Sequence, residues 1–121
     1  MSVFTKLPEE KILLHSEFFF LVYDGYPVSP GHILIISNLP RLDFFQLHEN
    51  EQQALSEMIL KSKEIIETAF KPDGYNIGMN CGIVAGQTVM HFHCHVIPRY
   101  KGDMVNPRGG VRHCVEGKGY Y

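Results

Sequence analysis

The feature that most constrains this chain is a row of alternating histidines. Imidazoles alternate with apolar or thiol side chains in His91-Phe92-His93-Cys94-His95-Val96-Ile97. Because side chains on a β-strand point alternately to its two faces, this spacing predicts a strand over Val89–Pro98. All three imidazoles then share one face, and the intervening side chains face a hydrophobic core.

Three imidazoles on one face support two kinds of chemistry. Neutral imidazole nitrogens ligate metals, and three histidines are a known zinc set, although such sites use carboxylates to orient the rings and the next carboxylate downstream is Asp103. Imidazole is also a nucleophile and a proton donor near neutral pH, with an unperturbed pKa of about 6.5. We favour nucleophilic catalysis on phosphorus and keep metal binding as the alternative.

Composition narrows the class of protein. A chain of 121 residues with 45% hydrophobic and 20% charged residues is typical of one soluble domain, spanning residues 1–121. No apolar run is long enough to span a membrane, and a net charge of −2 does not favour a nucleic-acid partner. Three cysteines without a CxxC motif (Cys81, Cys94 and Cys114) indicate free thiols and a cytoplasmic location.

The segments on either side of the histidine row suit a phosphate-bearing ligand. Residues 99–121 carry five Lys or Arg against two Asp or Glu, which indicates an anionic ligand near the row. The preceding loop contains glycines, which permit close approach of the backbone. It also contains three neutral donors suited to phosphate oxygens, Asn80, Gln87 and Thr88.

The remaining pattern predicts an α+β domain with an antiparallel sheet. Apolar residues at three- and four-residue intervals predict a long helix over His48–Phe70, and a short helix is expected over Leu7–Leu14. The predicted strands are Glu17–Asp24, His32–Ser37, Tyr75–Cys81 and the histidine strand.

Three segments together resemble the histidine triad superfamily. These are Ala85-Gly86-Gln87-Thr88-Val89-Met90-His91-Phe92-His93-Cys94-His95-Val96-Ile97-Pro98-Arg99, the stretch Asp24–Ile35 with its Pro30-Gly31-His32 turn, and Pro107–Arg112. The last segment resembles the tail of bacterial members near the dinucleoside polyphosphate hydrolase branch. The resemblance implies a five-stranded antiparallel sheet with one long and one short helix.

The resemblance also implies roles for individual residues. It makes His93 the nucleophile, and it places His95 to bond the phosphate and assist the leaving group. His91 and His32 resemble a pair that orients the ring of the nucleophile. Four further positions match contacts to the substrate, with Asp24 on the ribose hydroxyls and Asn80, Gln87 and Thr88 on phosphate.

The implied activity is nucleotidyl hydrolysis of a diadenosine polyphosphate through a covalent nucleotidyl-histidine. The alternatives are a purine nucleoside phosphoramidase and a nucleotide-binding regulatory module with slow turnover. The resemblance implies no metal in the catalytic step, although the substrate can arrive with Mg²⁺. It also implies a homodimer formed through the long helix and an edge strand. Arg108 and Arg112 are expected either to contact outer phosphates or to brace the dimer partner.

Overall fold

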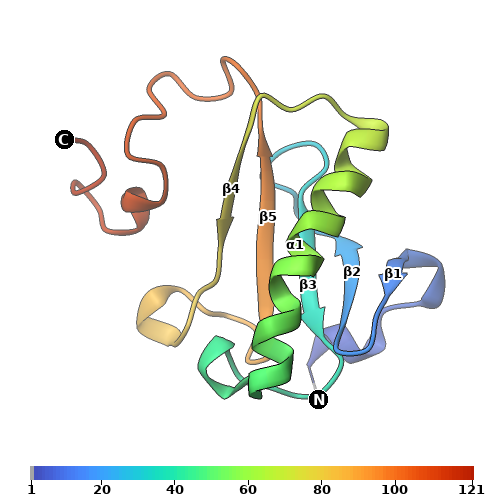
Figure 1. Ribbon diagram of the computed structural model, residues 1–121. Helices are drawn as coiled ribbons and strands as arrows, with labels where there is room; N and C mark the ends of the chain where they lie inside the picture. Colours follow the sequence, from blue (N-terminus) through green and yellow to red (C-terminus); the bar gives the residue numbers. More distant parts are fainter. Residues whose placement is uncertain (1) are drawn as a thin grey trace.

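The computed structural model describes residues 2–121, and within them five strands form one antiparallel sheet in the order β1-β2-β3-β5-β4 (Figure 1). The strands are β1 (Ile12–His15), β2 (Phe19–Tyr23), β3 (Ile33–Ser37), β4 (Gly74–Gly78) and β5 (His93–Arg99). One long helix, α1 (Glu49–Ala69), packs on the sheet. The predicted α+β class, the long helix and the four predicted strands are confirmed, with strand ends that shift by a few residues.

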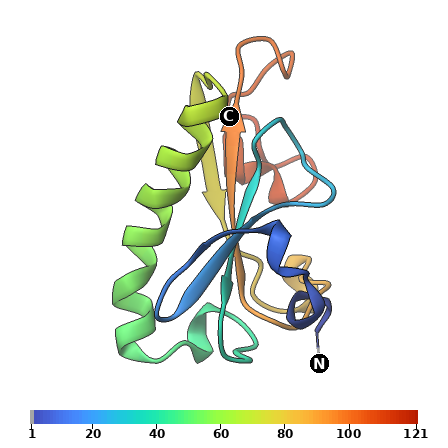
Figure 2. The ribbon, with the colours of Figure 1, turned by 90° about the vertical axis from the view of Figure 1, so that its right-hand side faces the viewer.

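The helix covers only one face of the sheet. Figure 2 shows α1 on one side and the N-terminal segment on the other. Cys94 and Val96 of β5 belong to the same buried cluster as Ile66 of α1. His93 and His95 alternate with these buried residues, so their side chains lie on the face opposite α1.

The histidine strand begins later than predicted. β5 starts at His93 rather than at Val89, so His91 lies outside the ladder. The reason is the pairing of the next residue: the Phe92 N–H donates to the carbonyl of Arg41 at 2.7 Å, in the loop after β3. The regular alternation therefore holds from His93 onward but does not include His91.

The short helix predicted over Leu7–Leu14 is wrong. Within residues 2–121, two 3₁₀ turns at Val3–Lys6 and Glu9–Lys11 lie on either side of the extended Pro8, and β1 follows. Proline lacks a backbone N–H and disfavours a helical conformation in the residue before it. The apolar residues after the second turn pair with β2 as an edge strand instead.

The segment between β4 and β5 is a glycine-containing loop, as the sequence predicts. A 3₁₀ turn at Ile83–Ala85 is bounded by Gly82 and Gly86, whose φ angles of 100° and 96° are in the region that favours glycine. The turn closes through hydrogen bonds from the Ala85 and Gly86 N–H groups to the carbonyls of Gly82 and Ile83. These glycines therefore give the segment before the histidines a compact shape.

The chain after β5 folds into turns beside β4, at the edge of the sheet (Figure 1). A 3₁₀ turn at Gly110–Cys114 makes the contact with this strand. Across residues 2–121, no helix combines the length and the apolar character that crossing a bilayer requires.

Candidate active site

The turn before β3 fixes the first imidazole of the site. Gly31 adopts a φ of 91°, and a side chain there would also lie 2.9 Å from the ring of Phe70, so both the backbone and the packing require glycine. The turn buries His32, whose Nδ1 accepts a hydrogen bond from the Val28 N–H at 3.0 Å. Because a neutral imidazole carries one proton, the proton of His32 is on Nε2.

His32 in turn fixes the protonation of His95. The His32 Nε2–H donates to Nδ1 of His95 at 2.9 Å, which leaves the His95 proton on Nε2. Burial, followed by the neighbouring His32 and His93, lowers the pKa of His95 to about 4, although Asp24 opposes the shift. His95 is therefore neutral at pH 7 and carries one N–H as a hydrogen-bond donor.

His93 has the opposite tautomer. Its Nδ1–H donates to the backbone carbonyl of His91 at 2.8 Å, so in the neutral ring the lone pair is on Nε2. The ring lies edge-on against Phe4, with a centroid distance of 5.0 Å, and 5.2 Å from the ring of His95. A lone pair on one imidazole and an N–H on its neighbour are the groups needed for nucleophilic attack on a phosphate.

The side chain of His91 is buried and serves the scaffold. Its Nε2–H donates to the carbonyl of Ser37 at 2.8 Å, and its Nδ1 accepts from the Ser2 hydroxyl at 2.7 Å. His91 thus orients the ring of His93 through its backbone carbonyl, whereas His32 contacts His95. The implied pairing of His91 with His32 around the nucleophile is corrected: the two act on different rings.

The histidine row does not form a single metal site. Both ring nitrogens of His91 are hydrogen-bonded within the fold, and one ring nitrogen of His93 is bonded to a carbonyl. Other ligand atoms do converge, on Asp24, His32 and His95, within 4.8 Å of one another. The Val28 N–H disfavours a metal there, because it keeps the proton on the His32 nitrogen that would have to ligate.

A cavity of about 470 Å³ lies over His93 and His95. Its apolar wall comes from three elements, with Phe4 and Leu7 before β1, Val22 on β2 and Leu34 on β3. Its polar lining includes Asp24, Asn80 and Thr88 from the predicted substrate contacts. The cavity therefore joins an apolar compartment to a polar end that contains both imidazoles.

Asp24 directly follows β2 and lies beside His32 and His95. Its Oδ1 accepts from the Tyr26 N–H at 2.8 Å, and its Oδ2 lies 3.5 Å from Nε2 of His32 and 4.0 Å from Nδ1 of His95. The carboxylate thus keeps oxygen lone pairs facing the cavity, as a partner for hydroxyl groups requires.

Gln87 does not line this cavity, contrary to its expected contact with substrate. Its amide nitrogen donates to the carbonyls of Leu42 and Val89 at 2.6 and 3.1 Å, and its oxygen accepts from the Gly82 N–H at 2.8 Å. The side chain is 3% exposed. The amide of Gln87 is therefore fully bonded to backbone groups, and Gln87 stabilises the loop that carries Thr88.

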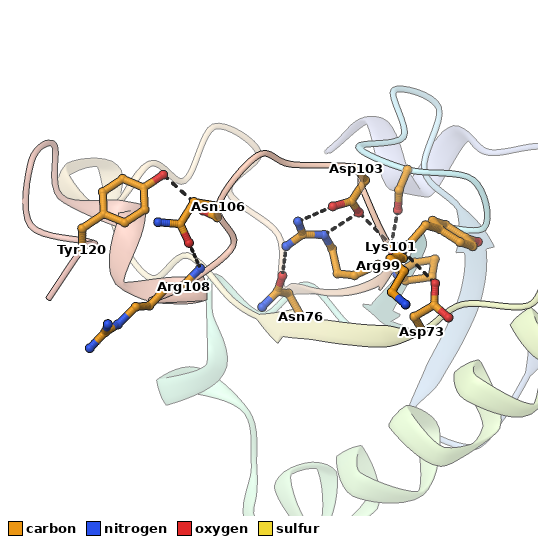
Figure 3. A network of polar contacts seen from close by, with 11 residues as sticks. Asp73, Asn76, Arg99, Lys101, Asp103, Asn106, Arg108 and Tyr120 are labelled. Atoms are coloured by element: carbon orange, nitrogen blue, oxygen red, sulfur yellow. Dashed lines mark hydrogen bonds and ion pairs between the residues drawn. The ribbon is translucent and has the colours of Figure 1, made fainter.

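The basic tail also lies away from the cavity, against the expectation of an anionic ligand beside it. Arg99 is paired with Asp103 and Asn76, as Figure 3 shows. The guanidinium groups of Arg108 and Arg112 lie 4.5 and 4.7 Å from the ring centroid of Tyr121. Among the described residues, those that line the cavity all precede the tail.

Sequence reasoning missed the contribution of the N-terminal segment. Ser2 and Phe4 contact His91 and His93, about 90 residues further along the chain. No local spacing could have revealed these contacts, because they depend on the turn of the N-terminal segment over the sheet.

The sequence comparison decides the family. A family model described as the HIT domain matches residues 6–102. The chain belongs to the HIT domain family. Its sheet and helix agree with a solved HIT family structure from Bacillus subtilis, with a TM-score of 0.76 and 27% identity over 84% of this chain and 75% of the other.

Among the curated relatives that this chain resembles are two yeast proteins whose names state an activity. The asymmetrical bis(5'-nucleosyl)-tetraphosphatase of Schizosaccharomyces pombe is 42% identical over 64% of this chain and 42% of its own length. The bis(5'-adenosyl)-triphosphatase of Saccharomyces cerevisiae is 31% identical over 82% of this chain and 50% of its own. The chain spans about half the length of the curated relatives it matches.

Proposed function

We propose that this protein hydrolyses dinucleoside polyphosphates such as diadenosine tetraphosphate, with His93 as the nucleophile. The observation that carries the proposal is the hydrogen bond from His93 Nδ1–H to the carbonyl of His91, because in the neutral ring it places the lone pair on Nε2, and His93 lines the cavity. The activities named for the two yeast relatives agree with this substrate class.

The reaction has two displacements at the α-phosphorus. His93 Nε2 attacks, a P–N bond forms, and the bond from phosphorus to the bridging oxygen breaks, so that a nucleoside polyphosphate departs with the electron pair. Water then attacks the same phosphorus and the P–N bond breaks. A nucleoside monophosphate leaves and the proton of the water is lost to solvent. Splitting one displacement into two is the usual advantage of a covalent nucleophile.

The other polar groups hold the substrate. His95 Nε2–H, Asn80 and Thr88 donate to phosphate oxygens, which stabilises the charge that develops in the transition state. Asp24 accepts from the ribose hydroxyls, and the apolar wall around Phe4 contacts the base. The reaction so written needs no resident metal, and substrate supplied as its Mg²⁺ complex is compatible with it. Full turnover of the Mg²⁺ complex of the substrate by protein that has been exhaustively chelated and dialysed supports this, and loss of turnover under these conditions contradicts it.

The protonation of His95 favours polyphosphates over phosphoramidates. A neutral His95 donates a hydrogen bond but has no spare proton for an amine leaving group, whereas a polyphosphate departs as a stable anion. A panel of dinucleoside polyphosphates and adenosine phosphoramidate, with products separated by chromatography, tests this choice. Faster turnover of the phosphoramidate would favour the alternative, and binding with negligible turnover of either would favour a regulatory module.

The nucleophile is tested by His93→Ala. The expected result is loss of nucleoside monophosphate release with nucleotide binding retained, together with loss of the nucleotidyl adduct that mass spectrometry detects after rapid quenching of the unmodified protein. His15→Ala is the matched control, because His15 is exposed and pairs with Glu9. Near-normal hydrolysis by His93→Ala would overturn the mechanism.

The protein is further proposed to act as a homodimer. β4 is an edge strand that the turn at Gly110–Cys114 contacts, and Ile77 on it is 42% exposed, so an apolar side chain at this edge is available to a second copy. Light scattering distinguishes a dimer from a monomer, and Ile77→Lys is expected to shift the population toward the monomer.

A further inference from the structure

A second cleft lies next to the cavity over His93. Its volume is about 690 Å³, and it shares three lining residues with that cavity, Val3, Thr88 and Val89. The two spaces are therefore neighbours that border the same three residues. The second cleft extends away from the cavity toward Pro40 and Met90.

The three shared residues line the same cavity as His93. His93 lines the first cavity and His91, two positions earlier, lines the second cleft. Both rings pack against Phe4, with centroid distances of 5.0 and 5.7 Å. Thr88 borders both spaces and is exposed. A ligand whose phosphate lies at His93 can therefore extend into the cavity or toward the cleft beyond Val3, Thr88 and Val89.

The lining of the second cleft suits a nucleoside better than a phosphate chain. Val3, Val89, Pro40 and Met90 provide apolar contact, and among the described residues that line it none is Lys, Arg, Asp or Glu. Met90 is 43% exposed, and a thioether on a cleft wall contacts aromatic rings favourably. A purine base is flat, aromatic and uncharged and fits the apolar part of this lining, while Ser2, Thr5 and Asn38 provide polar groups for its ring nitrogens or its ribose.

We propose that the second cleft binds the distal nucleoside of a dinucleoside polyphosphate, the one that departs with the leaving group. The first nucleoside then occupies the cavity over β2 and β3, the reacting phosphate lies at His93, and the rest of the phosphate chain crosses Thr88. This inference rests on the proposed function. It makes this protein selective for substrates with a nucleoside at each end of the phosphate chain.

The test compares diadenosine tetraphosphate with adenosine 5'-tetraphosphate, which has the same phosphate chain but lacks the second nucleoside. Pro40→Trp fills the cleft and Met90→Ala removes the thioether. We expect Pro40→Trp to lower kcat/KM for the dinucleotide about tenfold, with a smaller loss for Met90→Ala, because a lost base contact changes affinity on this scale. The kcat/KM for adenosine 5'-tetraphosphate should be unchanged in both variants. Leu60→Ala, an exposed site on α1, is the matched control.

Equal losses for both nucleotides, or no loss for either, would overturn the inference. If neither nucleotide is hydrolysed, the proposed function fails, and calorimetry on the His93→Ala protein still decides the role of the cleft. Pro40→Trp must then weaken binding of diadenosine tetraphosphate selectively. Unchanged or equally weakened dissociation constants for the two nucleotides would exclude a nucleoside in the cleft.

Discussion

Nε2 of His32 lies 2.9 Å from Nδ1 of His95, and this contact sets the protonation of the site. The Val28 N–H at 3.0 Å on the far side of the His32 ring determines which nitrogen donates. The Val28 amide thus fixes the tautomer of His32, and His32 in turn fixes the tautomer of His95. The N–H of His95 is therefore on Nε2, the nitrogen away from His32.

Removing this donor should slow turnover. In His32→Phe the ring packs in the same place but nothing donates to Nδ1 of His95, so His95 no longer holds one tautomer. We expect kcat to fall roughly 100-fold, the scale of a misplaced proton donor, with a smaller change in KM. Steady-state kinetics with diadenosine tetraphosphate measures the effect, and His15→Phe serves as the control. An unchanged kcat would show that His95 needs no partner.

The buried pair of His32 and His95 also predicts that the folded protein loses stability in acid. The pKa of His95 is lowered to about 4 by burial and by the neighbouring imidazoles, and burial also lowers the pKa of His32. Because the folded pKa of His95 lies below the unfolded value of 6.5, the unfolded chain binds more protons between these values. Its contribution to stability is therefore complete above about pH 6.5 and is lost as the pH falls toward 4.

Urea unfolding at several pH values measures this loss. Between pH 7 and pH 4.5 the free energy of unfolding should fall by up to about 3 kcal/mol on account of His95, the equivalent of its pKa shift. His95→Asn is expected to flatten the slope in this range. A slope that is the same in His95→Asn would assign the acid sensitivity to other groups.

How far the sequence predicts this molecule depends on the range of the contacts. The alternation from His93 to Arg99 and the stripe of α1 are local periodicities, and both were predicted. The position of His91 was not predicted, because hydrogen bonds to Ser2 and Ser37, which are distant in the chain, determine it. Spacing locates a residue on an element, but only the assembled fold shows which element it contacts.

The incorrect predictions for the short helix and for Gln87 have the same physical cause. Residues 12–15 have the composition of a short helix or a strand, and pairing with β2 decides for the strand. Gln87 has the chemistry of a phosphate ligand, but the carbonyls of Leu42 and Val89 and the N–H of Gly82 satisfy its amide first. Tertiary contacts thus override local propensity at both places.

Gln87 and Thr88 should therefore differ on mutation. Gln87→Leu leaves three backbone groups without their partner, and we expect it to cost about 2–3 kcal/mol of stability and to lower kcat as the loop relaxes. Thr88→Val changes an exposed hydroxyl, so stability should change by less than about 0.5 kcal/mol while KM for the nucleotide rises. Urea unfolding and kinetics on both variants separate the roles. Full stability in Gln87→Leu would contradict the role of Gln87 in holding the loop.

The ion pair between Arg41 and Glu51 ties the start of α1 to the histidine segment. Arg41 Nε donates to Glu51 Oε1 at 2.9 Å, and that oxygen also accepts from the His48 N–H at 2.7 Å. The backbone carbonyl of Arg41 accepts from the Phe92 N–H at 2.7 Å, directly before β5. A disturbance of the pair should therefore affect both the helix and the segment that carries His93.

Arg41→Met should be among the most destabilising substitutions on this segment. Glu51 is buried, and within residues 2–121 its Oε2 has no hydrogen-bond partner, so removal of the guanidinium leaves a carboxylate in the interior without a cation. We expect a loss of about 3–5 kcal/mol, and partial recovery in Arg41→Met/Glu51→Leu, which removes both charges. Calorimetric unfolding of both variants measures this. Equal losses would show that Glu51 contributes through the helix cap rather than through its charge, because the double variant also removes the acceptor for the His48 N–H.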